Sequence, residues 1–283
     1  MNTLLECIPC FARQALDAVV EAVVDPARRE PLLRRLLREI AESDWSGTPP
    51  AIAQRLHRSI RRELGNPDPS RNVKLRMNQM AASLVPLMRQ RIESHPHPFE
   101  AAVRVAIGGN LLDIGAKTQI AAEDLPAHLE TIWTQPLCGN VEALFRAADR
   151  ARSILYLADN AGEIFFDRLL LERLPTRNIA VAVRGSPVLN DATLEDAEQA
   201  GIPEIAPVFG NGSDAPGTIL ADCSDEFRRR FEQADLVISK GQGNYETLSD
   251  STKPIFFLFT VKCPLVASLV GKPVGSLVAK SSG

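Results

Sequence analysis

The chain reads ILYLADNAGE over residues 154–163. Apolar residues occupy consecutive positions from Ile154 to Ala158, which is typical of a strand buried on both faces of a sheet. The polar and glycine-containing segment Asp159–Glu163 follows at once, and a helical pattern covers 162–174. A buried strand, a polar turn and a helix in this order predict one βα unit of a parallel sheet.

The same rhythm repeats toward the C-terminus. Further apolar runs lie at 179–183, 205–208, 236–239 and 255–260, and helical patterns lie at 193–200, 225–233, 245–248 and 265–270. This alternation predicts a Rossmann-like, three-layer α/β/α domain over residues 151–283, with a mostly parallel sheet covered by helices. Because such sheets bind ligands beyond the carboxyl ends of their strands, the residues after each run are the candidate site.

The first half of the chain is helical in pattern. Apolar stripes of helical period predict helices over 11–24, 30–40, 72–92, 98–111 and 124–148, the last one broken near 136–139. Pro26 is expected to end or redirect the first of them, and Pro49-Pro50 predicts a proline-led helix start. We therefore predict a helical N-terminal domain over residues 1–150, before the α/β domain.

Composition and charge exclude several classes of protein. The 283 residues are 45% hydrophobic and 24% charged, which is typical of a globular chain. The net charge is −3 and neither half is strongly basic, so nucleic acid and membrane surfaces are not expected partners. No apolar run reaches the roughly 18 residues of a membrane span, and no secretory signal is recognisable. Five cysteines in such a chain predict a cytoplasmic protein without a disulfide framework.

Oxygen-bearing side chains follow the first two apolar runs. Asp159 and Asn160 come after the first run, and Asp191 comes after the second. Carboxylate and amide oxygens are the ligands that Mg²⁺ and Mn²⁺ prefer. Both aspartates could instead be helix N-caps. We interpret Asn190 as a left-handed turn residue rather than as a metal ligand.

Lysines and glycines follow the later runs. Lys240 and Lys262 each stand directly after an apolar run, in a chain with seven lysines and 25 arginines. A compact ammonium group suits a point contact to phosphate. Gly241, Gly243 and the Gly185-Ser186 pair would let the backbone approach an anion, with an ordinary tight turn as the alternative. The spacing matches neither a P-loop nor a dinucleotide fingerprint, so we exclude both.

The cysteines leave alternatives open. Cys7 and Cys10 form a C-x-x-C pair with no second pair and no matching histidine spacing. A structural role, a metal site and a redox pair are all compatible with this pattern. Cys263 is expected to be a small buried residue that begins a helix, with an activated thiol as the alternative.

Taken together, these motifs resemble the metal-dependent damage-control phosphatases, also called domain of unknown function 89, in their smaller prokaryotic branch. The resembling segments are Glu6–Cys10 with Gln14, Gly109–Gly115, Asp159–Glu163, Ser186–Ala197, Lys240–Glu246 and Lys262–Cys263. They appear in the family's order over nearly the whole chain. Their combination, rather than any one of them, is specific.

The resemblance implies a helical domain against an α/β/α domain, and a divalent metal (Mn, Mg, Co or Ni). The implied metal ligands are Asp159, Asn160 and Asp191. The predicted substrate and phosphate contacts are Glu163, Ser186, Lys240, Asn244 and Lys262. The resemblance also places Gly109–Gly115 and Lys74–Asn78 near the cleft.

The resulting hypothesis is a metal-dependent phosphatase of small phosphorylated metabolites, such as sugar phosphates or damaged phosphometabolites. Asp159, Asp191 and Lys240 are its predicted catalytic residues. Asp159 would orient the attacking water or accept its proton, with a phospho-aspartyl intermediate as the open alternative. Asp191 would complete the metal site, and Lys240 would neutralise phosphoryl charge. The other candidate functions are an S-adenosylmethionine-dependent carboxyl methyltransferase and a non-catalytic protein that binds metal or a phosphometabolite.

Overall fold

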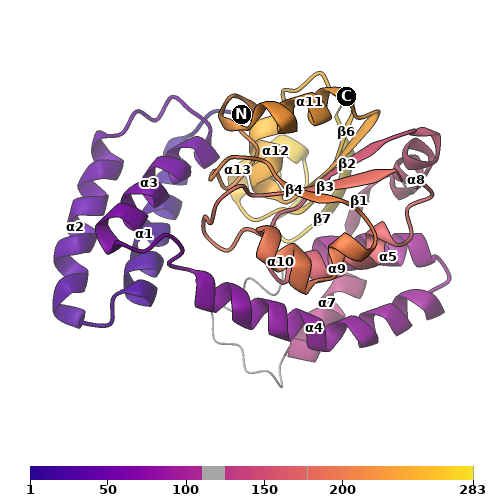
Figure 1. Cartoon of the computed structure of the whole chain (residues 1–283), viewed down its shortest axis with the longest axis horizontal. Coiled ribbons are helices and arrows are strands. Elements are labelled where there is room, and N and C mark those ends of the chain that lie inside the picture. The colour runs from indigo at the N-terminus through magenta and orange to yellow at the C-terminus, as the bar shows by residue number, and fades with distance from the viewer. Residues whose placement is uncertain (110–124, 177, 283) are drawn as a thin grey trace.

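The computed structural model describes residues 1–109, 125–176 and 178–282. A twisted sheet forms the centre of the molecule, helices cover it, and the first three helices stand to one side (Figure 1). No helix within these described ranges is long and apolar enough to cross a membrane.

The sheet has seven strands in the order β1-β7-β6-β5-β2-β3-β4. The strands are β1 (Leu137–Gly139), β2 (Ile154–Leu157), β3 (Ile179–Val183), β4 (Val208–Gly210), β5 (Leu236–Lys240), β6 (Ile255–Thr260) and β7 (Leu277–Ser281). Only the β6–β7 pair is antiparallel among these strands. The predicted mostly parallel sheet is confirmed.

Three of these strands differ from the sequence prediction. The pattern did not predict β1 or β7, because β1 has three residues and the end of β7 is exposed on both faces. The run predicted at 205–208 forms a strand only from Val208 on, and a 3₁₀ turn at Ile202–Glu204 precedes it. Ile202 and Ala206 are buried in the core beneath the sheet, so their apolar character reflects packing rather than strand pairing.

Alternate strand residues face two different helical layers. Tyr156 packs into the core of one face, and its neighbours Leu155 and Leu157 pack into the core of the other. The helices of the first face are α5 (Pro98–Gly108), α8 (Val141–Arg150), α9 (Glu163–Leu171) and α10 (Leu194–Gln199). The helices of the second face are α11 (Asp225–Gln233), α12 (Gln242–Leu248) and α13 (Pro264–Val270).

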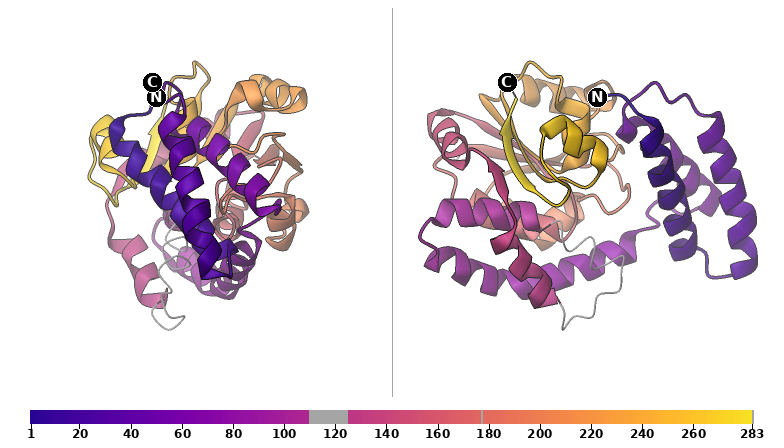
Figure 2. Two further views of the ribbon diagram at one scale, coloured as in Figure 1. Left: turned by 90° about the vertical axis from the view of Figure 1, so that its left-hand side faces the viewer. Right: turned by 180° about the vertical axis from the view of Figure 1, so that it is seen from behind.

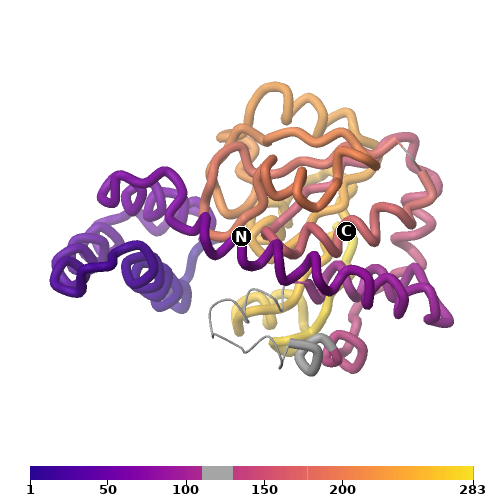
Figure 3. The backbone as a smooth tube through the Cα atoms, turned by 60° about the horizontal axis from the view of Figure 1, so that its bottom comes forward, coloured from indigo at the N-terminus to yellow at the C-terminus, as the bar shows by residue number. Residues whose placement is uncertain are grey.

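The core of the first face crosses the boundary predicted at residue 150. Helix α4 (Arg71–Ser94) packs on α5 and α9, and Ile132 of α7 (Leu125–Thr134) joins the same core. Figure 3 shows α4 running along this side of the molecule. The boundary stays a prediction about folding units, since the apolar contacts continue from α4 into the sheet.

Among the helices that the structure describes, only the first three have a core of their own. They are α1 (Ile8–Ala22), which a 3₁₀ turn at Leu5–Cys7 precedes, α2 (Pro26–Glu42) and α3 (Pro49–Leu64). Pro26 opens α2 and Thr48 caps the proline-led α3, as the fixed φ of proline favours. Figure 2 shows this bundle beside the α/β domain from two further sides.

Helix α3 fastens the bundle to the loop between β4 and α11. Gln54 donates to Asp214 and to Asp222, each at 2.7 Å. Arg58 donates to both oxygens of Asp214, and Arg61 pairs with the same carboxylate. The 3₁₀ turn at Leu220–Asp222 positions the carboxylate of Asp222 that accepts from Gln54. The bundle is therefore held close to the carboxyl edge of the sheet.

Candidate functional site

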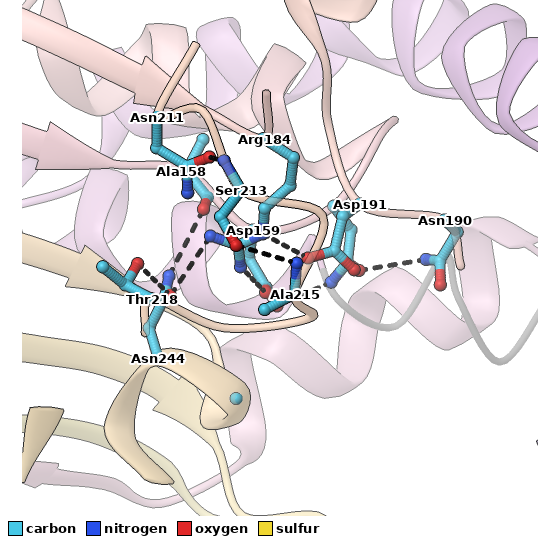
Figure 4. Close-up of polar contacts among 12 residues, drawn as sticks. Ala158, Asp159, Arg184, Asn190, Asp191, Asn211, Ser213, Ala215, Thr218 and Asn244 are labelled. Atoms are coloured by element: carbon cyan, nitrogen blue, oxygen red, sulfur yellow. Dashed lines mark hydrogen bonds and ion pairs between the residues drawn. The ribbon is translucent and has the colours of Figure 1, made fainter. Parts of the chain in front are cut away.

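The loops after β2 and β3 are joined at the carboxyl edge of the sheet (Figure 4). The Ala192 N–H donates to the carbonyl oxygen of Asp159 at 2.8 Å, and Asn160 and Asp191 form an isolated antiparallel bridge. Asp159, Asn160 and Asp191 are 7%, 5% and 3% exposed. The structure therefore brings the three predicted metal ligands together in a buried position.

Neither aspartate caps a helix. Gly162 occupies the N-cap position of α9, and Thr193 caps α10 in a capping box with Asp196. The alternative interpretation of Asp159 and Asp191 as caps is wrong, because Gly162 and Thr193 occupy the two N-cap positions. Two buried carboxylates are thus available for another purpose.

The amide groups of the site form a chain. Asn160 Nδ2 donates to Asp159 Oδ2 at 2.8 Å and to Glu163 Oε2 at 2.9 Å, and Asn190 Nδ2 donates to Asn160 Oδ1 at 3.1 Å. The interpretation of Asn190 as a left-handed residue is wrong, since Leu189 with φ 47° is the non-glycine residue in that conformation. Asn190 instead helps to orient Asn160.

Lys240 lies deeper in the protein than its predicted role as a phosphate contact requires. Its side chain is fully buried, and Nζ donates to Ala106 O at 2.7 Å, to Glu163 Oε1 at 2.8 Å and to Asp167 Oδ1. These three acceptors match the three N–H donors of an ammonium group. Burial opposes the charge, but Asp167 and Glu163 together raise the pKa of Lys240. Lys240 therefore holds Glu163 in place, rather than presenting free donors to a phosphate.

Asp167 completes this buried network. Tyr156 donates its hydroxyl to Asp167 Oδ1 at 2.8 Å. Burial raises the pKa of Asp167 to about 6, although Lys240 lowers it. Sequence reasoning missed Asp167. In the sequence it is a single polar position within a helical pattern, and its burial depends on strand β5 lying beneath helix α9.

Arg184 at the end of β3 is the second residue that sequence reasoning missed. Its Nε donates to Asp191 Oδ2 at 2.6 Å, and its Nη2 lies 3.6 Å from Asp159 Oδ1. Nη1 donates to Asn244 Oδ1 at 3.3 Å. One guanidinium thus touches both predicted carboxylate ligands. Its position directly after an apolar run was the available signal, but the chain has 25 arginines.

The buried cluster carries more negative than positive charge. Four carboxylates lie in it and two cations oppose them: Asp159, Glu163, Asp167 and Asp191 against Arg184 and Lys240. Burial, and then the charges of Glu163 and Asp191, raise the pKa of Asp159 well above its usual range. Bound protons or a further cation must offset this excess, since unpaired buried charge is strongly unfavourable.

A divalent cation fits that requirement. Two carboxylates and one amide supply the hard oxygen donors that Mg²⁺ and Mn²⁺ prefer. Within the described ranges, no three His, Cys, Asp or Glu side chains are arranged to hold a metal ion. Asp159 and Asp191 would therefore need the Asn160 amide oxygen, together with water or substrate oxygens, to complete the coordination.

The predicted phosphate contacts separate into a buried and an exposed group. Glu163 is engaged by Lys240 and Asn160, and Asn244 donates to the carbonyl oxygens of Lys240 (2.7 Å) and Ala158 (3.3 Å). Ser186 and Lys262 are exposed at the strand ends. Lys262 is close enough to lower the pKa of Asp159. Ser186 and Lys262 are thus accessible from solvent, whereas Asn244 holds the backbone at Ala158 and Lys240 in place.

Two further predicted segments have different outcomes. Asn78 of α4 accepts the Gly162 N–H at 2.7 Å and donates to Asp196 at 2.9 Å, and Lys74 pairs with Asp68 and Asp196. This stretch therefore supports the loops of the site from behind. The other segment, Gly109–Gly115, lies outside the described residues after its first position.

Gly241 at the start of α12 allows Asp159 to lie against the backbone. Its φ is +82°, and a Cβ built there would stand 2.0 Å from Asp159 Oδ2. A Cβ on Gly243 would stand 2.3 Å from Pro216 O. The tight-turn and close-approach interpretations of these glycines thus both apply, but the group that approaches Gly241 is a carboxylate of the chain itself.

Replacing Gly241 with Ala will displace Asp159. We expect kcat/KM to fall at least about 100-fold, because a shift of about 1 Å in a reacting group has that effect. Gly271→Ala is the matched control, since Gly271 has φ +64° and nothing within 4 Å of its Cβ position. Both variants bear a left-handed backbone penalty of roughly 1–2 kcal/mol, but only Gly241→Ala should lose activity. Equal activities in steady-state assays would contradict this interpretation.

A thiol and carboxylate cluster lies where α1 meets α12 and α13. Burial raises the pKa of Cys7 and of Cys10, and the charges of Glu246 and Cys263 raise both further. Cys263 stands at the start of α13 as predicted, as its N-cap residue whose Sγ accepts the Val266 N–H at 3.5 Å, but it is half-buried rather than buried. Every cysteine is a free thiol. The role of the C-x-x-C pair stays open.

Glu246 will make stability depend on pH. Burial raises its pKa from 4.5 to about 7. A carboxyl whose pKa rises on folding stabilises the fold fully below its unfolded pKa, and this contribution is lost as the pH rises through 7. Between pH 5 and pH 8, urea denaturation should show Glu246→Gln losing less free energy of unfolding than the wild type, by up to about 3 kcal/mol. Exposed Glu226→Gln should keep the wild-type slope, and an unchanged slope in Glu246→Gln would disprove the assignment.

Comparison with known proteins gives concordant matches. The model of the damage-control phosphatase ARMT1-like domain matches residues 3–278. A damage-control phosphatase of Archaeoglobus fulgidus is 40% identical over 81% of both chains, and damage-control phosphatase PH1575 of Pyrococcus horikoshii is 34% identical over 98% of this chain and 97% of that one. A crystal structure of a DUF89 family protein from Pyrococcus horikoshii superposes with a TM-score of 0.90 at 32% identity, over 100% of both chains.

Proposed function

We propose that this chain, which belongs to the damage-control phosphatase ARMT1-like domain family, hydrolyses small phosphorylated metabolites with the help of a divalent metal. The relatives' names support the phosphatase activity. The observation that carries the metal dependence is the buried convergence of Asp159, Asn160 and Asp191, in a cluster with excess negative charge. Sugar phosphates and damaged phosphometabolites are the proposed substrates.

Asp159, Asn160 and Asp191 would hold the cation. A bound divalent cation polarises a phosphoryl oxygen and lowers the pKa of a bound water. Which of Mn, Mg, Co and Ni supports activity is an outcome of the experiment below, since an oxygen donor set accepts several of them.

The chain's own side chains prepare the site for a phosphate ester. The exposed ammonium of Lys262 attracts the phosphate dianion to the carboxyl edge of the sheet, and Ser186 offers a hydroxyl on the loop after β3. Asp159 orients the attacking water or accepts its proton. Lys240 and Glu163 act through Asn160, because Glu163 joins the two by hydrogen bonds.

The test is an assay of metal-stripped protein on p-nitrophenyl phosphate and a panel of sugar phosphates, with Mg²⁺, Mn²⁺, Co²⁺ or Ni²⁺ added one at a time. We expect turnover only when a metal is present. Equal turnover in excess chelator would disprove metal dependence. Measured metal binding without turnover on any ester would identify a non-catalytic binding protein instead. Binding of S-adenosylmethionine by calorimetry, again without turnover, would favour the methyltransferase.

A further inference from the structure

Arg184 has donors that its present partners do not use. A guanidinium carries five N–H groups in a planar fork. Nε serves Asp191 and Nη1 serves Asn244. Nη2 is buried, and among the described residues it has no hydrogen-bond partner. A buried cationic donor without an acceptor is unfavourable, so we expect Nη2 to donate to a group that binds at this site.

The direction of Nη2 connects it with the site. It lies 3.6 Å from Asp159 Oδ1, beyond hydrogen-bond reach, while Nε of the same group is 2.6 Å from Asp191 Oδ2. The guanidinium therefore spans the two carboxylates that would hold the cation. Any anion bound next to those carboxylates has Nη2 as a neighbour.

Lys240, the other cation of this buried cluster, cannot donate to a bound anion in the same way. All three N–H donors of Lys240 are taken by protein acceptors. Asn244 likewise has its Nδ2 engaged by two backbone carbonyls, and its Oδ1 accepts from Thr218 and Arg184. Of the two cations in this buried cluster, Arg184 is the one with a donor to spare for a phosphoryl oxygen.

We propose that Arg184 has two successive roles: it neutralises Asp159 and Asp191 in the metal-free protein, and it donates through Nη2 to a phosphoryl oxygen once a divalent cation has taken over those carboxylates. This inference rests on the proposed function of the same site. The planar fork suits bidentate contact with phosphate oxygens, which a lysine cannot reproduce.

The two roles predict opposite effects of one substitution. A divalent cation competes with the guanidinium for the same carboxylates, so removing the positive charge should not weaken metal binding. The phosphate contact, by contrast, disappears with the guanidinium. A purely structural role would weaken both kinds of binding together, because the carboxylates would lose their alignment.

The experiment measures Mn²⁺ binding and, at saturating Mn²⁺, inorganic phosphate binding by calorimetry in wild type, Arg184→Gln and Arg184→Lys. We expect Arg184→Gln to bind Mn²⁺ at least as tightly as the wild type and to bind phosphate at least about tenfold more weakly, the scale of one charged hydrogen bond. Arg184→Lys keeps the charge and loses the fork, so phosphate affinity should fall with Mn²⁺ affinity unchanged. Arg152→Gln is the matched control, because Arg152 is exposed and forms a surface ion pair with Asp235.

Each outcome decides the question. Phosphate affinity within about threefold of wild type in both variants overturns the proposal, and so does a parallel tenfold loss of Mn²⁺ and phosphate binding. If Arg184→Gln does not fold, as circular dichroism would show, Arg184→Lys carries the test alone. A wild type that binds neither Mn²⁺ nor phosphate would refute the proposed function, which is a result distinct from failure of this inference.

Discussion

Replacing Asp159 with Asn will abolish phosphatase turnover and stabilise the metal-free protein. The substitution keeps the size of the side chain and removes one of the two carboxylates of the proposed metal site. We expect kcat/KM to fall at least about 1,000-fold, since a metal supplies several kcal/mol of charge stabilisation and each 1.4 kcal/mol is tenfold in rate.

The stability effect has the opposite sign, because the pKa of Asp159 is raised by burial and by Glu163 and Asp191. An ionised carboxyl in this position destabilises the metal-free fold at neutral pH. The denaturation midpoint in chelator at pH 7 should therefore rise in Asp159→Asn. Exposed Asp225→Asn should change neither activity nor midpoint. A variant that keeps wild-type turnover, or one that unfolds earlier than the wild type in chelator, would show that the site is assigned wrongly.

Replacing Lys240 with Met will destabilise the protein strongly. The substitution leaves Glu163 and Asp167 buried without their common cation. Breaking a buried ion pair in this way costs about 3–5 kcal/mol. The loss should be largest near pH 8 and smaller at pH 5. Without Lys240 both carboxylates lose their common cation, and protonation at low pH removes the unpaired negative charge.

Lys262→Met is the matched control for this prediction. It makes the same chemical change at the end of the neighbouring strand, where the side chain is exposed. Urea denaturation in chelator should show a change within about 0.5 kcal/mol for Lys262→Met. A loss of less than about 1 kcal/mol in Lys240→Met would mean that the buried network contributes no more than a surface ion pair. Phosphate affinity should respond in the reverse order, with the larger loss in Lys262→Met.

The sheet could be predicted because its signal is local. Four consecutive apolar residues in β2 and five in β6 mark strands buried on both faces, and the polar residues after them mark the carboxyl edge. The convergence of the three predicted metal ligands agrees with the same reasoning, since the loops after β2 and β3 meet where those strands are neighbours. Sequence reasoning missed the short strands β1 and β7. Strand β1 has three residues, and β7 has three buried residues followed by two exposed ones, so neither shows a distinctive hydrophobic period.

The amino-acid sequence by itself determined the βα alternation around β2, β3, β5 and β6, the edge of the sheet where the candidate site lies, and the presence of Asp159, Asn160 and Asp191 there. Only the tertiary structure decided what each cation does. Lys240 is the last residue of β5 and Lys262 lies two residues after β6, so the two lysines have similar places along the chain. Yet Lys240 meets Ala106 and Glu163, 134 and 77 residues away, whereas Lys262 is exposed. Local sequence patterns reflect backbone preference and burial period, but the partner of a buried charge depends on which distant elements pack around it.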